Sequence, residues 1–459
     1  MVSTDRRATV RALTRLVPAA AALLLSFGHA HAQFGVGGGF GGAVGGISID
    51  TDGIIRNLDP GALESLAAER TRWLAEARWN ARAGDARKVS LAAVCAAVHA
   101  ATEKGTPLPS EVLFLGGLQR IDHVFVDPDG HDIVLCGPAD ELVVDAGGAV
   151  VGAKSHLPPL HLEDFVVALR AIDAARAGGM TCSIDPAPEG IAKLQNLLRR
   201  QGTIGPNPKA TFTAMEEALG PQKVTVAGVP GDSRFARVLV AADYRMKRIG
   251  MGLEESGIAE LPSYLAMVPA GSRATTLPRF WLEADYDPIA RDADELAWRI
   301  GDRRMKCLTE SDVAGEGGMK RGAAPADAVA RKWCDAMTAT YEQLSARHPI
   351  FAELTNCVDL AVVAALIHGR QLDKRAGCDL SALLEPASFP LPRYDVPTAV
   401  PTVATGVKKG SNWVLSASGG VKFQPWQFAA NTVDAADLAA SRTATLAARP
   451  ADVAGCSWD

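Results

Sequence analysis

The sequence contains none of the short motifs that mark the better-known catalytic and phosphate-binding sites. There is no His-Glu-x-x-His, no Gly-x-Ser-x-Gly, no Ser-x-x-Lys and no Gly-x-x-x-x-Gly-Lys. Cysteine pairs spaced as Cys-x-x-Cys, or spaced as zinc ligands, are missing as well. The sequence therefore assigns no mechanism, no metal and no cofactor, and it leaves open whether the chain is an enzyme.

Positive charge is not in excess. The chain has 47 Lys and Arg against 52 Asp and Glu, a net charge of −5. Proteins that bind nucleic acid neutralise its phosphates with an excess of basic side chains. We therefore expect no nucleic-acid partner.

The length and composition are those of a globular protein rather than a disordered chain. Of the 459 residues, 48% are hydrophobic and 22% are charged. A single hydrophobic core stops growing at about 250–300 residues. The chain is therefore expected to form two packed units, or one domain with large additions.

Long apolar runs are scarce, and the one near the N-terminus has the features of an export signal. Four arginines precede the run Leu16 to Phe27, and Ala30-His31-Ala32 follows it. This order is typical of a secretory signal peptide. We expect residues 1–32 to be removed by cleavage before Gln33. Arg6-Arg7 leaves a twin-arginine route open beside general secretion.

Cleavage would make the protein more acidic. It removes four basic residues and one acidic residue, which leaves 43 against 51 and a net charge of −8. The longest later apolar run, Val358 to Ile367, is half a membrane span and favours a buried helix. We expect a periplasmic or extracellular protein with no transmembrane segment after cleavage, whose partner is an unidentified component of the envelope or the extracellular space.

All eight cysteines follow the expected cleavage site, in a compartment that permits disulfides. They are Cys95, Cys136, Cys182, Cys307, Cys334, Cys357, Cys378 and Cys456. The sequence favours the pairs Cys307/Cys334 and Cys357/Cys378, because each closes a loop of moderate length and would stabilise the protein by about 3 kcal/mol. Cys95 and Cys136 fall in an expected helix and an expected strand, where a free thiol packs as a small apolar group.

The N-terminal third begins with a glycine-rich, flexible lead-in at residues 33–50. A helical segment is expected over residues 51–110. Its first helix begins at Asp59-Pro60 and extends to about Arg82, and its second covers Ser90 to Glu103.

Residues 111–312 predict a mixed α/β core. Alternating hydrophobicity around the turns Asp127–Gly130 and Asp145–Gly148 predicts two hairpins, over Ile121–Leu135 and Glu141–Val151. Helix and strand signals then alternate. They predict a helix over Leu162–Ala175, a strand over Thr181–Asp185, a helix over Pro188–Arg200, a strand over Lys223–Val229, a helix from Ser233 to Leu253, a strand with Arg279–Leu282, a short helix near Asp294–Ile300 and an extended piece over Arg304–Thr309.

The C-terminal third predicts a loop over Gly315–Ala324 and then a helical hairpin over residues 325–384. Pro349 separates the two helices of this hairpin. Residues 385–459 predict an irregular, proline-rich tail that wraps the body. The tail would carry one small hairpin, formed by Asn412–Leu415 and Val421–Phe423. The whole pattern predicts an α+β fold.

Acidic, basic and hydroxyl side chains are densest between Gly231 and Glu254. One interpretation is structural: Asp232 or Ser233 caps a helix, and Asp243 forms an exposed pair with Lys247 that contributes about 0.3–0.5 kcal/mol. The other is functional, with Lys247 as a desolvated base or anion clamp that Asp243 orients. The candidate catalytic residues are Asp185, Glu189, Asp232, Asp243, Arg245 and Lys247.

A second cluster, His156 and His161 with Glu163 and Asp164, resembles a set of metal ligands. Two prolines lie between the histidines and prevent the helical geometry that would bring the imidazoles together. We therefore expect loop histidines followed by an acidic pair at a helix N-terminus.

Several stretches carry a resemblance to a known family. They are Thr181–Pro186 with Glu189-Gly190, Leu219–Gln222, Val229–Glu254, Asp132–Ala139, Arg279–Trp281, and Asn356 with Asp359–Ala364. These stretches resemble an uncharacterised family of exported bacterial proteins, familiar from planctomycete genomes and known as domain of unknown function 1598. The resemblance covers about residues 45–425 and implies no activity.

Two classes of function stay open. A binding or structural protein of the cell envelope or extracellular space needs no catalytic signature, and the sequence favours it. The alternative is a secreted hydrolase with a site around residues 232–254. It would require the six candidate residues to converge on one concave site.

Overall fold

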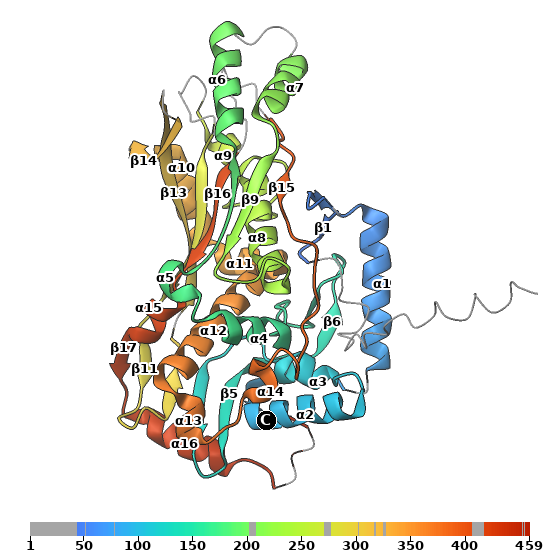
Figure 1. The fold of residues 1–459 in the computed structure, drawn as a ribbon, viewed down its shortest axis with the longest axis vertical. Coiled ribbons are helices and arrows are strands. Elements are labelled where there is room, and N and C mark those ends of the chain that lie inside the picture. Colours follow the sequence, from blue (N-terminus) through green and yellow to red (C-terminus); the bar gives the residue numbers. More distant parts are fainter. Residues whose placement is uncertain are drawn as a thin grey trace, which may run out of the picture.

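The computed structural model describes residues 44–50, 52–77, 79–201, 208–269, 277–301, 303–315, 318–324, 327–405, 417–451, 453 and 455–459. The expected signal peptide and residues 33–43 of the expected lead-in lie outside these ranges. The described residues form a mixed α+β fold, built on two seven-stranded sheets (Figure 1).

The upper sheet, named for its position in Figure 1, has the strand order β14-β13-β10-β16-β8-β9-β15. Neighbouring strands are antiparallel except β10 and β16, which are parallel. The strands are β8 (Met180–Pro186), β9 (Gln222–Ala227), β10 (Arg279–Tyr286), β13 (Arg303–Gly315), β14 (Gly318–Ala324), β15 (Ala399–Val400) and β16 (Ser418–Phe423). Along β8 and most of β10, buried and less buried residues alternate, because one face of the sheet packs on helices.

The lower sheet has the order β17-β11-β12-β4-β5-β3-β18. Its strands are β3 (Gly84–Ser90), β4 (His123–Asp127), β5 (Asp132–Ala139), β11 (Ile289–Arg291), β12 (Ala297–Arg299), β17 (Thr432–Asp434) and β18 (Ser457–Trp458). The described residues also form two short two-stranded sheets. One pairs β1 (Ile47–Ile49) with β2 (Ile55–Asn57), and the other pairs β6 (Leu142–Val144) with β7 (Val150–Gly152).

Helix α12 (Pro349–Arg370) is the central helix of the core. It contacts α4 (Leu162–Ala171), α8 (Arg234–Gly250) and α15 (Pro425–Ala430). Among the described residues it is the one helix long and apolar enough to cross a membrane, but 94% of its most apolar window is buried inside the protein. The expectation of a buried helix over Val358 to Ile367 is therefore confirmed.

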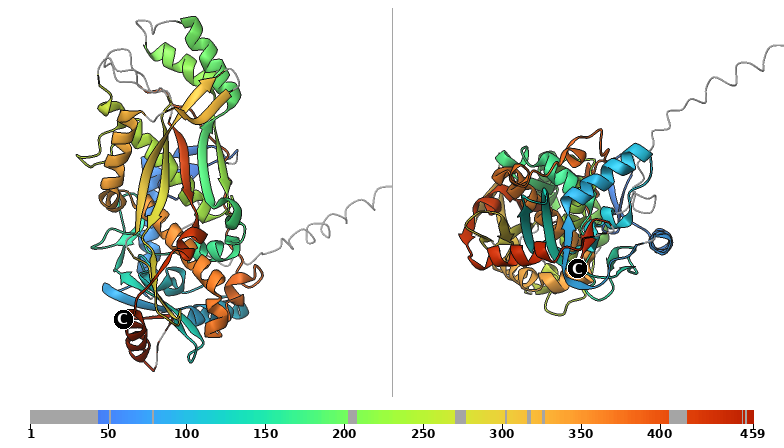
Figure 2. Two further views of the ribbon diagram at one scale, coloured as in Figure 1. Left: turned by 90° about the vertical axis from the view of Figure 1, so that its left-hand side faces the viewer. Right: turned by 90° about the horizontal axis from the view of Figure 1, so that it is seen from below.

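The other helices surround this core. They are α1 (Pro60–Glu76), α2 (Leu91–Lys104), α3 (Ser110–Leu113), η1 (Leu115–Gly117), α5 (Ala175–Gly178), α6 (Pro188–Gln201), α7 (Pro208–Leu219), α9 (Tyr264–Met267), α10 (Ala328–Ala339), α11 (Tyr341–Arg347), α13 (Leu372–Ala376), α14 (Ser381–Leu384) and α16 (Asp437–Ala447). Figure 2 shows the elongated molecule from two further sides, with α6 and α7 at one end and α16 at the other.

Several local predictions are confirmed. The carboxylate of Asp59 accepts a hydrogen bond from the Ala62 amide at 2.9 Å, and Ser90 and Ser233 cap α2 and α8 in the same way. Both hairpins form, as β4–β5 and β6–β7. These features depend on neighbours in the sequence, which is why the sequence identifies them.

Other predictions are corrected by contacts that are remote in the sequence. Helix α1 ends at Glu76, because Ala77 takes an extended backbone and Ala81 then packs with Phe114. The short helix expected near Asp294–Ile300 is wrong. Asp292 instead accepts the amides of Leu296 and Ala297 in a turn, and the following residues form β12, which pairs with β4.

The C-terminal third also differs from the prediction. The loop expected over Gly315–Ala324 is wrong, because β14 pairs there with β13. The first helix of the expected hairpin, before Pro349, is divided at Thr340 into α10 and α11. Val421–Phe423 belongs to β16, between β10 and β8, so it forms no local hairpin. Asn412–Leu415 lies outside the described residues.

Residues 385–459 supply regular strands where the sequence predicted an irregular tail. β15 pairs with β9, β16 with β10 and β8, β17 with β11, and β18 with β3. This segment therefore wraps the body as expected, and it closes both sheets with strands whose partners lie far away in the sequence.

The eight cysteines are all buried and free. The Sγ atoms of Cys307 on β13 and Cys334 on α10 lie 3.4 Å apart, farther than the about 2.05 Å of a disulfide bond. The expected pairing of Cys357 with Cys378 is wrong in this structure. Thirteen helical residues, or about 20 Å, separate Cys357 from the end of α12, and Cys378 instead lies near Cys95.

Candidate functional site

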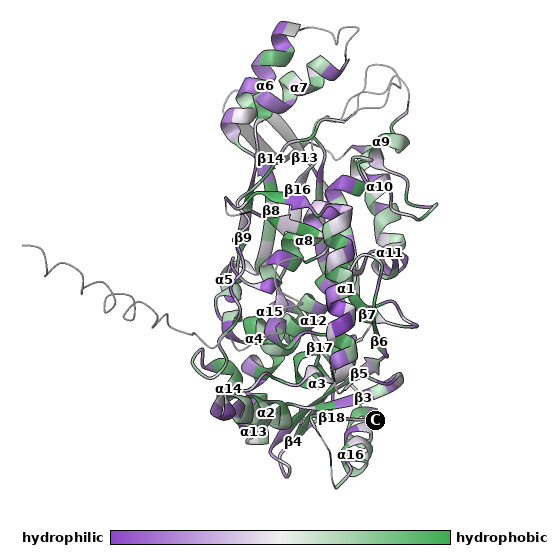
Figure 3. Cartoon of the chain, turned by 90° about the vertical axis from the view of Figure 1, so that its right-hand side faces the viewer, coloured by the Kyte–Doolittle hydropathy of each residue, from purple (hydrophilic) through white to green (hydrophobic). Residues whose placement is uncertain are grey.

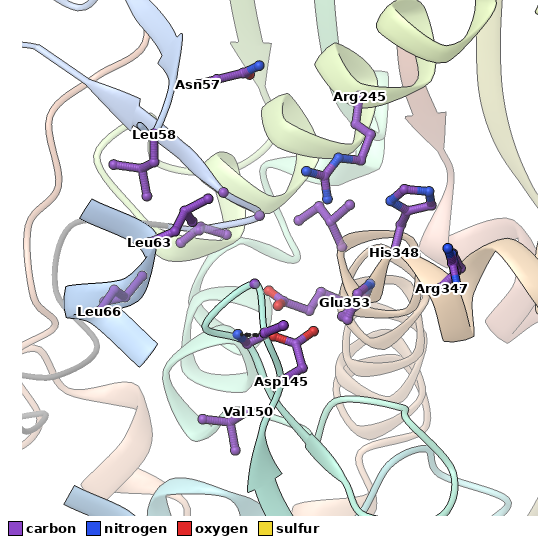
Figure 4. A pocket seen from close by; sticks show the side chains of 18 of the residues that line it. Asn57, Leu58, Leu63, Leu66, Asp145, Val150, Arg245, Arg347, His348 and Glu353 are labelled. Atoms are coloured by element: carbon purple, nitrogen blue, oxygen red, sulfur yellow. Dashed lines mark hydrogen bonds between the residues drawn. The ribbon is translucent and has the colours of Figure 1, made fainter. Parts of the chain in front are cut away.

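A cavity of about 540 Å³ lies where α1, the β6–β7 turn, α8 and the start of α12 meet (Figure 4). Seven basic side chains line it: Arg70, His161, Arg234, Arg245, Arg248, Arg347 and His348. Three acidic side chains line it as well: Asp145, Glu254 and Glu353. The cavity is therefore a polar site in which five arginines face three acidic side chains.

One wall of the cavity is organised around Glu254. Arg245 Nε lies 3.0 Å from one Glu254 carboxylate oxygen, and Arg248 Nε lies 3.4 Å from the other. His348 Nδ1 is 4.0 Å from the same carboxylate. One negative charge is thus shared by two arginines, so this wall keeps a net positive charge.

His348 is held in one orientation by the backbone. Its Nε2 lies 3.0 Å from the carbonyl oxygen of Ser256. A carbonyl oxygen can only accept a hydrogen bond, so Nε2 carries the proton. Burial lowers the pKa of His348, partly opposed by the Ser256 carbonyl, and the charge of Arg245 lowers it further. The imidazole is therefore neutral at pH 7.

Arg347 provides a cation without an acidic partner. It is the last residue of α11, its side chain lines the cavity, and the structure gives it no hydrogen bond or ion pair within the described part of the chain. It lies close against Gly257, where an added Cβ would come within 2.6 Å of its Nε. Glycine at that position leaves room for the guanidinium.

A buried ion cluster lies behind the other wall. Arg234 forms a short hydrogen bond with Asp164, and its Nη2 lies 2.5 Å from Glu353 Oε2. Its Nε lies 3.6 Å from Glu163, which also accepts a hydrogen bond of 3.0 Å from the Tyr394 hydroxyl. The cluster thus joins α4, α8, α12 and the C-terminal segment.

Burial controls the charges in this cluster. It raises the pKa of Glu163 to about 7 and that of Asp164 to about 6, with Arg234 opposing both changes. Burial disfavours the charged guanidinium, but the neighbouring carboxylates raise the pKa of Arg234 above its ordinary value. Arg234 therefore stays charged, while Glu163 and Asp164 take up protons at a higher pH than ordinary carboxyl groups do.

Two helix N-termini meet at the cavity, and a histidine stands at the N-cap of each. His161 precedes α4 and His348 precedes α12, and neither side chain caps its helix. The first turn of α12 holds no acidic residue, so its partial positive charge remains for an anion. Burial, followed by the charges of Arg234 and Arg70, lowers the pKa of His161 well below its usual value.

The six residues predicted as catalytic do not share one cavity: only Arg245 lines it, while Asp185, Asp243 and Lys247 lie near one another between α8 and the upper sheet. Asp185 pairs with Arg279 at 2.8 Å in the upper sheet. Glu189 is exposed at the start of α6, and Asp232 is half-buried, 3.9 Å from the exposed Arg393.

Asp243 and Lys247 are buried, so their interpretation as an exposed pair is wrong. The Lys247 ammonium lies 2.8 Å from Asp243 and also donates hydrogen bonds to the carbonyls of Ile184 (3.0 Å) and Gly419 (3.2 Å). Burial raises the pKa of Asp243 to about 7, and Lys247 opposes the change. The pair anchors α8 to β8 and β16.

The two faces of α8 explain this division. Arg245 and Arg248 lie on the same side of α8 as Arg234, because they follow it by 11 and 14 positions in a helix with 3.6 residues per turn. Asp243 and Lys247 are 9 and 13 positions after Arg234, on the opposite side. One face therefore lines the cavity and the other packs on the upper sheet.

Of the cavity residues outside residues 231–254, the sequence singled out His161 alone as a candidate ligand. Arg70 lies on α1, and Arg347, His348 and Glu353 lie near the α11–α12 junction, so only the tertiary fold brings them together. The expected acidic pair at a helix N-terminus, Glu163 with Asp164, is confirmed. The sequence near Arg234 did not indicate that this residue pairs with Glu163 and Asp164.

Part of the cavity lining comes from a segment that matches a known sequence family. Residues 182–264 match a family described as a protein of unknown function, DUF1598. The resemblance to this family is therefore confirmed over that segment. The DUF1598 segment runs from β8 to the start of α9 and supplies Arg234, Arg245, Arg248 and Glu254 to the cavity. No curated protein and no solved structure matches the chain.

Proposed function

We propose that this protein is an exported binding protein and that the cavity holds a small organic anion. The observation that carries the proposal is the wall formed by Arg245, Arg248 and Arg347, where Glu254 pairs with Arg245 and Arg248 and no described residue pairs with Arg347. A carboxylate or phosphate would form charge-assisted hydrogen bonds with these guanidinium groups.

The size and position of the cavity support the same conclusion. Its volume of about 540 Å³ is within the usual range of about 300–1,000 Å³ for small-molecule sites. Its lining comes from four separate parts of the chain, so a bound anion would join α1, α8 and α12. Mutual repulsion among the arginines would be relieved on binding.

Export is part of the proposal. The basic start, short apolar run and Ala30-His31-Ala32 support cleavage before Gln33 and a periplasmic or extracellular location. In an oxidising compartment we further propose that Cys307 and Cys334 form a disulfide. Their sulfur atoms are already neighbours, at 3.4 Å.

The proposal is tested by titrating the mature protein with acetate, succinate and inorganic phosphate at low ionic strength, followed by calorimetry and thermal unfolding. A ligand that binds the folded state alone raises its stability. Arg347→Gln should weaken binding about tenfold or more, because it removes a charge-assisted hydrogen bond. Arg331→Gln, at an exposed position of α10, should leave binding unchanged. Failure of all three anions to bind would contradict the proposal.

A hydrolase remains the second candidate, and one observation favours it. Glu353 lines the cavity, where its carboxylate lies 2.5 Å from Nη2 of Arg234. A carboxyl group inside a cavity is the kind of group that acts in general acid or base catalysis. Mass spectrometry of ester and glycoside probes after incubation separates the candidates, since a binding protein returns them unchanged.

A further inference from the structure

The cavity wall opposite Arg245 and Arg347 carries three leucines beside Arg70. Leu58, Leu63 and Leu66 line it, and each is half-buried. None of the three belongs to a hydrophobic cluster of the described core, nor is any of them packed against one. These side chains therefore present apolar surface to the cavity, with Leu66 also lying against Gly148 of the β6–β7 turn.

Helix α1 holds two of these leucines in place. Leu63, Leu66 and Arg70 recur at spacings of three and four residues, so they share one face of the helix. The C-terminal half of the helix is anchored, because Arg70 Nη1 donates to the Gly148 carbonyl at 2.6 Å and Trp73 packs edge-on against Phe114. Figure 3 shows α1 running along the outside of the molecule, on the side where α8 and β7 lie.

The two walls differ sharply in chemistry. Figure 4 shows Leu58, Leu63 and Leu66 on one side of the cavity, and Arg245, Arg347 and His348 on the other. A ligand that fills the space between them must present an anionic group at one end and hydrocarbon at the other. A wholly polar anion would leave the three leucines in water.

We infer that the ligand is an amphipathic anion, with a carboxylate or phosphate head at Arg245 and Arg347 and a hydrocarbon part against Leu58, Leu63 and Leu66. This inference rests on the proposed function and names the chemical class of its ligand. The leucine wall selects for chain length, and the arginine wall selects for the sign of the charge.

The test is a chain-length series on the mature protein. Acetate, butyrate, hexanoate and octanoate are titrated by calorimetry below their micellar concentrations, with octyl phosphate to compare head groups and octylamine to reverse the charge. Each buried methylene should raise affinity about threefold to fourfold. Octanoate should therefore bind far more tightly than butyrate, and octylamine should not bind.

Substitutions in the two walls test which end of the ligand each wall contacts. Leu63→Ser combined with Leu66→Ser should remove most of the gain in affinity with chain length, so that octanoate binds little more tightly than butyrate. Leu198→Ser, at an exposed position of α6 outside the cavity, is the matched control and should change neither affinity. Arg347→Gln should weaken every anion by a similar factor, since it acts on the head group alone.

The outcomes separate this inference from the proposed function. If acetate binds with dependence on Arg347 but affinity does not rise with chain length, the amphipathic ligand is excluded and anion binding stands. If octylamine binds as tightly as octanoate, the site is merely apolar and both proposals fail. The wild-type series decides these points even if the leucine variant does not fold.

Discussion

Removing the Lys247 ammonium tests the buried pair on α8 most directly. Asp243 is fully buried, and its carboxylate accepts a hydrogen bond from the Lys247 ammonium. Lys247→Met keeps the aliphatic stem and the helix propensity, but it leaves a buried carboxylate and two buried carbonyls, of Ile184 and Gly419, without this donor. Breaking a buried pair in this way costs about 3–5 kcal/mol.

The loss should depend on pH. Burial raises the pKa of Asp243 to about 7 in the folded protein, above its value in the unfolded chain, so the folded state binds more protons between those two values. Stability from this group is therefore present at low pH and is lost as pH rises toward about 7. Without Lys247 the folded pKa rises further, so Lys247→Met should be more destabilising at pH 8 than at pH 5.

Equilibrium urea unfolding of the mature protein at both pH values measures these effects. The matched control is Lys306→Met, because Lys306 forms an exposed pair with Asp285 at 2.7 Å. That change should cost less than about 1 kcal/mol at either pH. A loss for Lys247→Met as small as the control, and independent of pH, would refute the buried-pair reasoning.

Three further predictions concern processing and the core. Peptide mapping under non-reducing conditions, on protein recovered from the oxidising compartment, should find Cys307 linked to Cys334; two free thiols there would contradict the proposed disulfide. Intact-mass measurement of protein exported by its native host should give a chain that begins at Gln33, and an uncleaved N-terminus would exclude processing. Arg234→Met should cost about 3–5 kcal/mol or prevent folding, because three buried carboxyl groups lose their cation; unchanged urea unfolding would show that the cluster does not stabilise the protein.

The sequence by itself determined the local elements of this protein. Asp59, Ser90 and Ser233 were identified as helix starts because a capping side chain bonds to an amide only a few residues away. The two hairpins followed for the same reason. The run Val358 to Ile367 was identified as a buried helix because its composition alone is incompatible with solvent.

Only the tertiary structure decided which faces meet. Nothing near β16 in the sequence indicates that it pairs with β10 and β8, because the backbone groups of β16 form hydrogen bonds with strands more than a hundred residues away. The same holds for α8, whose charged residues divide between a cavity and a sheet according to helical angle and to what packs on each side. Arg347 and Leu63 reach one cavity for this reason: burial and charge pairing depend on chain segments that the fold, not the local sequence, brings together.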